Sequence, residues 1–261
     1  MILPLMALGF LGAAFLMLLL WLVGLRSKNA GWVDFGWAAA LVLLAVWAAV
    51  TGAGWKPRRL AVAFMAAVWG GRLASMILGR LLRDGREDPR YRKIREEWKQ
   101  DTELRFFLFF QLQALVAAVL ALPYFLASAN PRAVFAPVEW AGVFLWAAGF
   151  AGEALADRQL ADFKRDPANR GKVCERGLWN HSRHPNYFFE ALQWVAWSVF
   201  ALGSPHGWTA VICPAMMLHF LLNVSGVPPA EAQSLASRGD AFRRYQKTTS
   251  VFVPWFKRSA A

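Results

Sequence analysis

The stretch WNHSRHPNYFFE gathers side chains that could do chemistry, and it lies between a basic stretch and an almost wholly apolar segment. Pro185 suits the first turn of a helix, because the N–H that proline lacks would have no partner there. The free N–H groups of such a helix start, with Arg183 and His184 just before it, can hold a phosphate. Asn186 and Glu190, one turn apart, could bind a ribose, an amide or an amine. The pattern favours a site for an elongated nucleotide lying along the helix.

A metal site is the less favoured interpretation of the same stretch. His181 and His184 could ligate a metal ion as an i, i+3 pair, but no carboxylate or Cys lies close enough to complete the site. Cys174 and Cys213 make no metal or redox spacing and imply no disulfide framework. The chain also lacks the glycine-rich motifs of Rossmann and P-loop proteins and the nucleophile elbow of hydrolases. A bound dinucleotide would therefore be held without either nucleotide-binding fold.

Other ionisable side chains fall inside apolar segments, where contact with lipid is costly, so each is a candidate for function. Asp34 begins one segment, and Arg72 lies in the next with Trp69 one turn earlier on the same face. Glu153 and Asp157 are four residues apart, so both point the same way. A polar stripe at the start of a further segment comprises Asn186, Glu190 and Gln193.

Simpler interpretations of these residues stay open. Asp34 and Arg72 could form a buried ion pair between two helices, and Glu153 and Asp157 could face water in the headgroup zone. Such pairing accounts poorly for several polar groups and basic loops gathering at one end of the helices, which favours a shared functional site.

The elements that must position these residues are long apolar helices. The chain of 261 residues is 57% hydrophobic and contains 14 Trp and 20 Phe. About 20 apolar residues suffice to cross a bilayer, and lipid favours helices because backbone groups must bond internally. The apolar runs lack the alternation of a β-barrel. The sequence predicts an all-α, integral membrane seven-helix bundle in a single domain, 1–261, with spans at about 2–25, 33–50, 60–82, 104–127, 138–156, 187–202 and 208–224.

The first of these segments is predicted to be a retained transmembrane helix. Residues 1–25 carry no charged side chain, no basic residue precedes the run, and no small-residue cleavage site follows it. A secretory signal would instead have basic residues before a shorter apolar run and a small-residue cleavage site after it.

Basic residues are distributed very unequally between the two sides of the predicted bundle. With seven spans, 22 of the 29 Lys and Arg fall in connections on one side and four on the other. The positive-inside rule then predicts an integral, multi-pass protein, such as one of a bacterial inner membrane, with its N-terminus outside and its C-terminus in the cytoplasm. This topology accounts for the net charge of +12 without a nucleic-acid partner.

Two polar stretches are predicted to form short helices on the cytoplasmic side. The loop after the third span mixes both charge signs and is expected to form one or two interfacial helices broken at Gly85 and Pro89. The polar tail after the last span is expected to form an amphipathic helix, closing with aromatic residues at the interface with membrane lipids.

Three stretches of the chain together resemble a known family: GLWNHSRHPNYFFE, GREDPRYRKIREEW and RRYQKTTSVFVPWF. They are similar to the bacterial DUF1295 branch of the steroid 5α-reductase-like membrane proteins, and the resemblance runs from Asp34 to Phe256. The shorter core R-H-P-x-Y is shared with isoprenylcysteine carboxyl methyltransferases, so the core alone does not select the cofactor.

The resemblance implies a seven-helix bundle that holds NADPH in a cavity open to the cytoplasm, with lipid-like enones entering from the membrane. The Asn and Glu of the family's sixth-helix motif match Asn186 and Glu190, and the acidic position of its fifth helix matches Asp157. From the helix start and this resemblance together, the expected cofactor contacts are Arg72, Glu153, Asp157, Lys164, Arg183, His184, Asn186, Tyr187, Glu190, Glu231, Arg238 and Tyr245.

The same resemblance implies a catalytic pair, Asp34 and Trp69. Steroid-reducing members use a Gln–Glu pair and a Tyr to grip the substrate ketone, and Val33, Asp34 and Trp69 stand at those positions. Trp can donate one hydrogen bond but cannot act as an acid. Asp34 would have to be protonated to donate a second.

The expected activity is NADPH-dependent reduction of a C=C bond conjugated to a carbonyl in a steroid-like or other lipid. One alternative is a membrane methyltransferase using S-adenosylmethionine, which gives less reason for the pair Asn186 and Glu190 or for the long basic loop. The other alternative is a non-enzymatic scaffold or transporter, although the internal repeat common in transporters is not evident.

Overall fold

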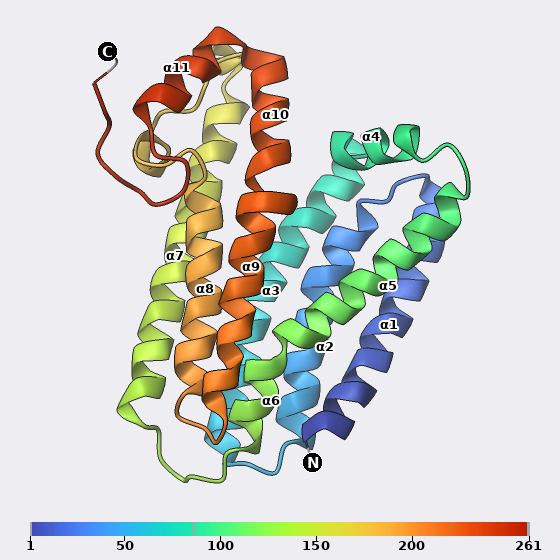
Figure 1. The fold of residues 1–261 in the computed structure, drawn as a ribbon, viewed down its shortest axis with the longest axis vertical. Coiled ribbons are helices and arrows are strands. Elements are labelled where there is room, and N and C mark those ends of the chain that lie inside the picture. Colours follow the sequence, from blue (N-terminus) through green and yellow to red (C-terminus); the bar gives the residue numbers. More distant parts are fainter. Residues whose placement is uncertain (1, 86, 260–261) are drawn as a thin grey trace. The chain divides into compact units, whose positions relative to one another are not determined.

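A computed structural model describes residues 2–85 and 87–259 (Figure 1). Helices account for 79% of the structure, and the part of the chain it describes contains no strand, only an isolated bridge between Ser182 and Ser250. The all-α prediction is confirmed. Residues Met1, Arg86, Ala260 and Ala261 lie outside the described residues. Of these, Arg86 belongs to the motif GREDPRYRKIREEW and to the count of basic residues given above.

The chain divides into two units. The first unit is Met1–Ala136 with Ala201–Trp208, and the second is Pro137–Phe200 with Thr209–Ala261. The helices of the first unit are α1 (Ile2–Ser27), α2 (Trp32–Thr51), α3 (Lys56–Asp84), α4 (Pro89–Glu97), α5 (Thr102–Leu120) and α6 (Leu122–Ala129).

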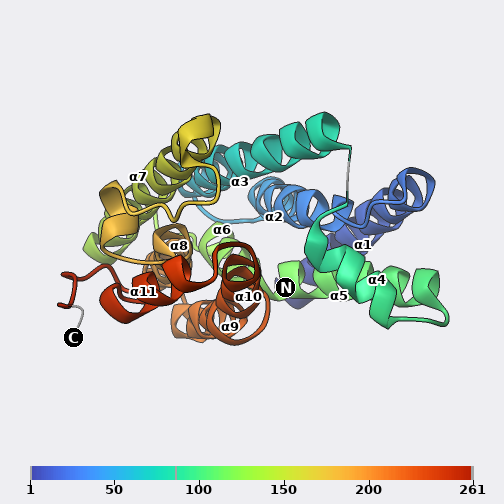
Figure 2. The ribbon, with the colours of Figure 1, turned by 90° about the horizontal axis from the view of Figure 1, so that it is seen from above.

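In the first unit, α2 packs between α1 and α3, and α5 packs along α1 (Figure 2). The indole of Trp47 on α2 donates to the carbonyl of Leu5 on α1 at 2.9 Å. Trp37 on α2 meets Trp69 on α3 edge to face, with ring centroids 6.2 Å apart. The contact between Trp37 and Trp69 joins the first half of α2 to the middle of α3, the parts of these helices that carry the catalytic candidates.

A buried arginine secures the end of the first unit that lies opposite α4. The guanidinium of Arg58 is fully buried and donates to the carbonyls of Asn130, Arg132 and Val134 at 2.7–3.0 Å. Backbone carbonyls have no water to bond in such a place, so one side chain with five donors can satisfy several of them. Arg58 therefore has a structural role.

The second unit contains the remaining elements. They are α7 (Pro137–Arg165), the short 3₁₀ turns Pro167–Asn169 and Gly177–Asn180, α8 (Pro185–Ala201), the 3₁₀ turn Gly207–Val211 that begins at the unit boundary, α9 (Ile212–His219), a π-helical turn Phe220–Val224, α10 (Val227–Arg238) and α11 (Asp240–Thr248). Helix α8 begins at Pro185, as predicted.

Helices α7 and α8 run side by side in opposite directions (Figure 1). A Cβ added at Gly142 on α7 would lie 2.7 Å from the backbone nitrogen of Phe200, and one at Gly149 would lie 3.3 Å from the side chain of Gln193. The absence of a side chain at these positions lets the two helices approach closely, as small residues do between membrane helices.

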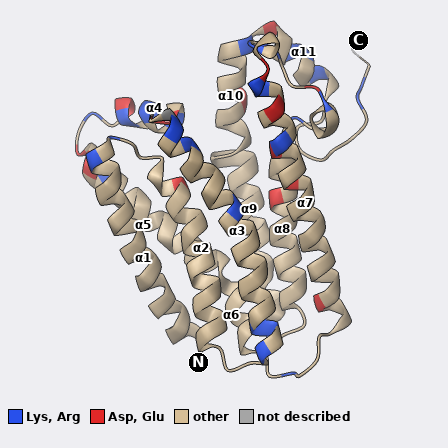
Figure 3. Ribbon diagram, turned by 180° about the vertical axis from the view of Figure 1, so that it is seen from behind, with Lys and Arg blue, Asp and Glu red and all other residues tan. Residues whose placement is uncertain are grey.

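Within the residues that the structure describes, five helical segments are long and apolar enough to cross a membrane. They are Ile2–Ser27, Trp32–Thr51, Lys56–Arg83, Thr102–Ala129 and Gly207–Arg238. Their central parts are largely free of charged residues in Figure 3. Several apolar helices of this kind are consistent with a multi-pass membrane protein. The predicted spans at 138–156 and 187–202 lie in α7 and α8, which are not among the five: α8 has only 17 residues.

Three details differ from the sequence expectation. The fourth segment bends at Ala121, where α5 ends and α6 begins, because the following Pro123 has no N–H to continue the helical ladder. The seventh segment passes through a π-helical turn and continues into α10, so the polar tail begins inside a long helix. The tail forms two helices instead of one, because Gly239 with φ of +50° breaks it.

Candidate functional site

Asp34 in the first unit is held by the surface helix α4. The phenol of Tyr91 donates to Oδ1 of Asp34 at 2.6 Å, and Arg90 donates to Oδ2 at 3.1 Å. Arg80 on α3 lies 3.9 Å from the same oxygen. The observed ion pairs of Asp34 are therefore with Arg90 and Arg80, and the alternative pairing with Arg72 is not the one found. Both carboxylate oxygens act as acceptors in this arrangement.

The start of α4 explains how Arg90 and Tyr91 reach Asp34. Asp88 caps the helix, and its carboxylate accepts from the backbone N–H of Arg90 at 3.0 Å. Pro89 occupies the first turn, where it costs no hydrogen bond. Burial alone would raise the pKa of Asp88, but the hydrogen bonds and positive charge of Arg90 outweigh burial and lower it. The first turn of α4 is thus fixed against the beginning of α2.

Tyr91 is the least accessible member of this group. Its side chain packs against Phe109 on α5, and only 5% of its surface is exposed. Burial, followed by the negative charge of Asp34, raises the pKa of the Tyr91 phenol well above its usual value. The phenol therefore keeps its proton and offers it to Asp34 throughout the physiological pH range.

The other catalytic candidate of the first unit, Trp69, is buried on α3 with 1% of its surface exposed. Its ring rests on Trp37, which follows Asp34 by three residues on the same face of α2. Arg72 lies one turn beyond Trp69 and is partly buried. Asp34 and Trp69 thus both lie in the first unit, Asp34 with α4 and Trp69 against Trp37 of α2.

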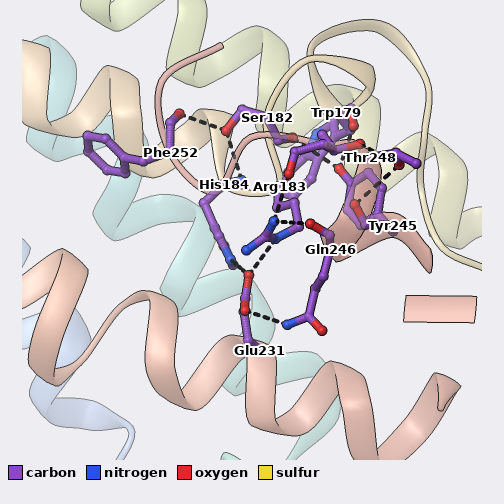
Figure 4. Close-up of polar contacts among 10 residues, drawn as sticks. Trp179, Ser182, Arg183, His184, Glu231, Tyr245, Gln246, Thr248 and Phe252 are labelled. Atoms are coloured by element: carbon purple, nitrogen blue, oxygen red, sulfur yellow. Dashed lines mark hydrogen bonds and ion pairs between the residues drawn. The ribbon is translucent and has the colours of Figure 1, made fainter. Parts of the chain in front are cut away.

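In the second unit, four polar side chains meet at the start of α8 (Figure 4). Arg183 donates through Nε to Glu231 on α10 at 2.6 Å, and through Nη1 to the carbonyls of Gln246 and Thr249 at 3.0 and 2.7 Å. His184 lies 3.3 Å from the same carboxylate, which also accepts from the amide of Gln246 at 2.7 Å. We call Arg183, His184, Glu231 and Gln246 the terminal cluster. It joins α8, α10 and α11.

Tyr245 reinforces this region from α11. Its hydroxyl lies within hydrogen-bond distance of the carbonyls of Trp179 and Ser182, the latter at 3.0 Å. Ser182 in turn donates to the carbonyl of Phe252 at 2.7 Å and accepts from the backbone N–H of His184 at 3.1 Å. Burial raises the pKa of the Tyr245 phenol well above its usual value, so the donor is retained. The tail of the chain is thereby fastened to the loop before α8.

A second polar arrangement follows the seam between α7 and α8. The amide of Asn186 donates to Asp157 at 3.3 Å, and its oxygen Oδ1 is buried without a hydrogen-bond partner. The contacts of Asn186 with Asp157, of Gln193 with Gly149 and of Phe200 with Gly142 set one antiparallel register. In that register Glu153, which is 4% exposed, stands at the level of Glu190.

The seam polar row consists of Asp157, Asn186, Glu153, Glu190 and Gln193. The row runs along α8 from Asn186, which lies level with Asp157 on α7, to Gln193. These two ends are seven residues apart, which corresponds to about 10 Å of helix. The predicted stripe on α8 and the predicted acidic pair on α7 are therefore brought together. All five residues belong to the second unit.

The remaining predicted contacts lie outside both arrangements. Arg238 at the end of α10 donates to the carbonyl of Lys172 at 3.0 Å in an exposed position. Lys164 is exposed in the last turn of α7. Tyr187 stacks on His184, with ring centroids 5.3 Å apart. Within residues 2–85 and 87–259, no three His, Cys, Asp or Glu side chains are grouped as metal ligands would be.

Sequence reasoning assigned no role to several residues of these clusters. Arg90 and Tyr91 lie in the motif GREDPRYRKIREEW, which carried the family resemblance, so a signal was present although no single residue was chosen. Gln246 and Ser182 act through contacts with backbone and side chains distant in sequence, and no pattern around them indicates this.

The fold and the buried polar groups define an all-helical, multi-pass membrane protein with polar side chains enclosed among apolar helices. Residues 20–249 match the family described as "Protein of unknown function (DUF1295)". The chain therefore belongs to this family, the steroid 5α-reductase-like family that its motifs resemble.

One relative is an uncharacterized protein of Schizosaccharomyces pombe, which is 28% identical over 208 residues. The match covers 69% of this chain and 60% of the relative, so the chain spans less than two thirds of that protein. No solved structure matches the chain.

Proposed function

We propose that the protein is a membrane-embedded reductase that uses NADPH to reduce a C=C bond conjugated to a carbonyl in a steroid-like or other lipid. The observation that carries this proposal is the seam polar row, where Asn186 Oδ1 and both polar atoms of Gln193 are buried without a hydrogen-bond partner. Buried polar atoms are nearly always bonded, so these atoms favour a ligand that bonds them. Family membership supports the same activity.

The seam residues fit an elongated ligand with several neutral polar groups. Asn186 Oδ1 would accept a hydrogen bond from a hydroxyl or amine of the ligand, while the amide of Asn186 stays on Asp157. Glu153 and Glu190 would accept from ribose hydroxyls at the next level. Arg183 and His184, engaged with Glu231, would hold the start of α8 in place for this binding. When bound, NADPH would supply the hydride for the reduction.

In the first unit, the proposed catalytic residues are Asp34 and Trp69. The indole N–H of Trp69 can donate one hydrogen bond to negative charge that develops on a substrate oxygen. Asp34 accepts a hydrogen bond from Tyr91, so at this position the phenol carries the proton and the carboxylate orients it. We therefore propose that Asp34 and Tyr91 act as a pair, in which the carboxylate of Asp34 orients the phenol of Tyr91.

The proposed topology has seven spans, with α7 and α8 as the fifth and sixth, in a membrane such as the bacterial inner membrane. The asymmetry of Lys and Arg supports a cytoplasmic C-terminus and an external N-terminus. The seam polar row and the terminal cluster would then be open to cytoplasmic nucleotide.

The test is nucleotide binding by the purified protein in detergent. Energy transfer from the 14 Trp to bound NADPH gives a Kd, and S-adenosylmethionine is titrated in competition. We expect the wild type to bind NADPH. Asn186→Leu should raise the Kd for NADPH about tenfold, because the buried acceptor Oδ1 and its hydrogen bond to the ligand are lost. Ser198→Ala is the matched control, since Ser198 lies on the same helix but bonds the carbonyl of Ala210.

Three results would contradict the proposal. Binding of S-adenosylmethionine without NADPH would favour the methyltransferase. Binding of neither would favour a non-enzymatic protein. Equal NADPH affinity of wild type and Asn186→Leu would show that the seam is not the binding site. Oxidation of NADPH with a panel of lipid enones then identifies the substrate.

A further inference from the structure

Gln193 on α8 is a buried amide that makes no hydrogen bond. Its side chain is 1% exposed, and neither Oε1 nor Nε2 has a partner. An amide in this condition destabilises the fold, because it has lost its bonds to water and gained none in the protein. Gln111 on α5 provides a comparison, since its amide donates to the carbonyl of Ala14 at 3.4 Å.

Gln193 faces α7. A Cβ placed at Gly149 would lie 3.3 Å from the Gln193 side-chain carbon Cδ, so the amide of Gln193 packs over this glycine, and a larger residue there would displace it. The indole nitrogen of Trp146, three residues before Gly149, is also buried without a partner. Unpartnered donors and an acceptor therefore gather at the inner end of the seam polar row.

The position of Gln193 along α8 indicates which part of a ligand it would meet. It lies seven residues, about 10 Å, beyond Asn186 and further from the basic start of the helix. A charged group so far inside apolar helices would be costly, so the group bound there is neutral. A primary carboxamide is complementary to glutamine, because each presents one oxygen acceptor and an NH₂ donor.

We propose that Gln193 recognises the carboxamide of the nicotinamide ring through a pair of N–H···O bonds. This inference rests on the proposed function, because it takes the ligand to be a nicotinamide dinucleotide. It assigns the neutral end of the dinucleotide to the inner end of the seam, where an apolar substrate would meet it. Gln193 is then a positioning residue that fixes the ring about its glycosidic bond.

The test compares NADP⁺ with its 3-acetylpyridine analogue, in which a methyl group replaces the carboxamide NH₂. Calorimetric titration of the full-length protein in detergent gives the Kd of each. We expect the wild type to bind the analogue about tenfold more weakly. Gln193→Met, which keeps the shape of the side chain, should bind NADP⁺ about tenfold more weakly than the wild type and bind both nucleotides alike. Gln111→Met is the matched control and should keep the wild-type ratio.

Ligand-free thermal unfolding separates this role from a structural one. Gln193→Met removes a buried unbonded amide, so we expect its Tm without nucleotide to equal or exceed that of the wild type. A structural glutamine bonded within the fold would instead give a lower Tm.

Two results would overturn the inference. The first is equal affinity of the wild type for NADP⁺ and the analogue. The second is a Kd ratio of the two nucleotides in Gln193→Met that equals the wild-type ratio. In both cases binding of NADP⁺ leaves the proposed function standing. Wild type that binds neither nucleotide would overturn both proposals.

Discussion

Removal of Arg183 should destabilise the second unit strongly and specifically. Its guanidinium makes three hydrogen bonds, and the side chains of Arg183 and Glu231 are only 11% and 15% exposed. Breaking a buried ion pair by removing one partner costs about 3–5 kcal/mol, because the other charge is left uncompensated. The pair is not wholly buried, so we expect Arg183→Met to cost about 3 kcal/mol. That corresponds to a fall in Tm of about 6–12 °C.

A double-mutant cycle separates the stranded charge from the lost hydrogen bonds. Glu231→Gln keeps an acceptor for Arg183 and His184 but leaves the charge of Arg183 uncompensated, so it should also cost about 3 kcal/mol alone. The double variant strands no charge, so its loss should be about 2 kcal/mol smaller than the sum of the single losses. Thermal unfolding of the purified protein in detergent, followed by circular dichroism, measures all three.

Arg243→Met is the control, because its ion pair with Asp240 is on the surface, with side chains 68% and 78% exposed. It should cost less than about 0.5 kcal/mol. Additive losses for Arg183 and Glu231 would refute the reasoning. So would an unchanged Tm for Arg183→Met accompanied by a large loss of NADPH affinity, because Arg183 would then be a phosphate ligand and not a clamp.

Three further changes test other contacts. Tyr245→Phe should lower stability by about 1–2 kcal/mol and leave the Kd for NADPH unchanged, because its hydroxyl bonds backbone carbonyls; thermal unfolding and titration measure the two effects. Tyr91→Phe should reduce turnover of an identified enone while the Kd holds, because Asp34 loses its donor; steady-state kinetics checks this. The lowered pKa of Asp88 stabilises the fold above about pH 4 and this contribution is lost as pH falls through the folded value, so Asp88→Asn should show a shallower decline of Tm on acidification.

Local signals in the sequence were enough to predict the helices that carry the candidate site. Proline at position 185 after a polar stretch marks the start of α8, and Gly85 followed by Pro89 marks the gap between α3 and α4. These signals act through backbone geometry, which depends on neighbouring residues alone. The bend at Ala121 was missed because hydropathy does not change there, although Pro123 indicates it.

The partners of the polar side chains could not be predicted in the same way. Asp34 meets Arg90 and Tyr91 across 56 and 57 residues of sequence, and the choice of these partners over Arg72 depends on how α4 folds back onto α2. Arg183 has the residue type and position of a phosphate ligand, but three of its bonds go to the protein itself. Residue type indicates what a side chain can bind, whereas tertiary packing decides what it does bind.

Helix α8 shows this division within a single element. At its start the polar groups of the terminal cluster bond one another, so their removal should change stability before it changes ligand affinity. Along the seam, both polar atoms of Gln193 have no such bonds, so its removal should change affinity at little cost to the ligand-free fold, whereas removal of Asn186 also breaks its bond to Asp157. If variants of Gln193 instead lost stability without nucleotide, its unpartnered atoms would be bonded within the protein in solution, and the ligand would have to be sought elsewhere.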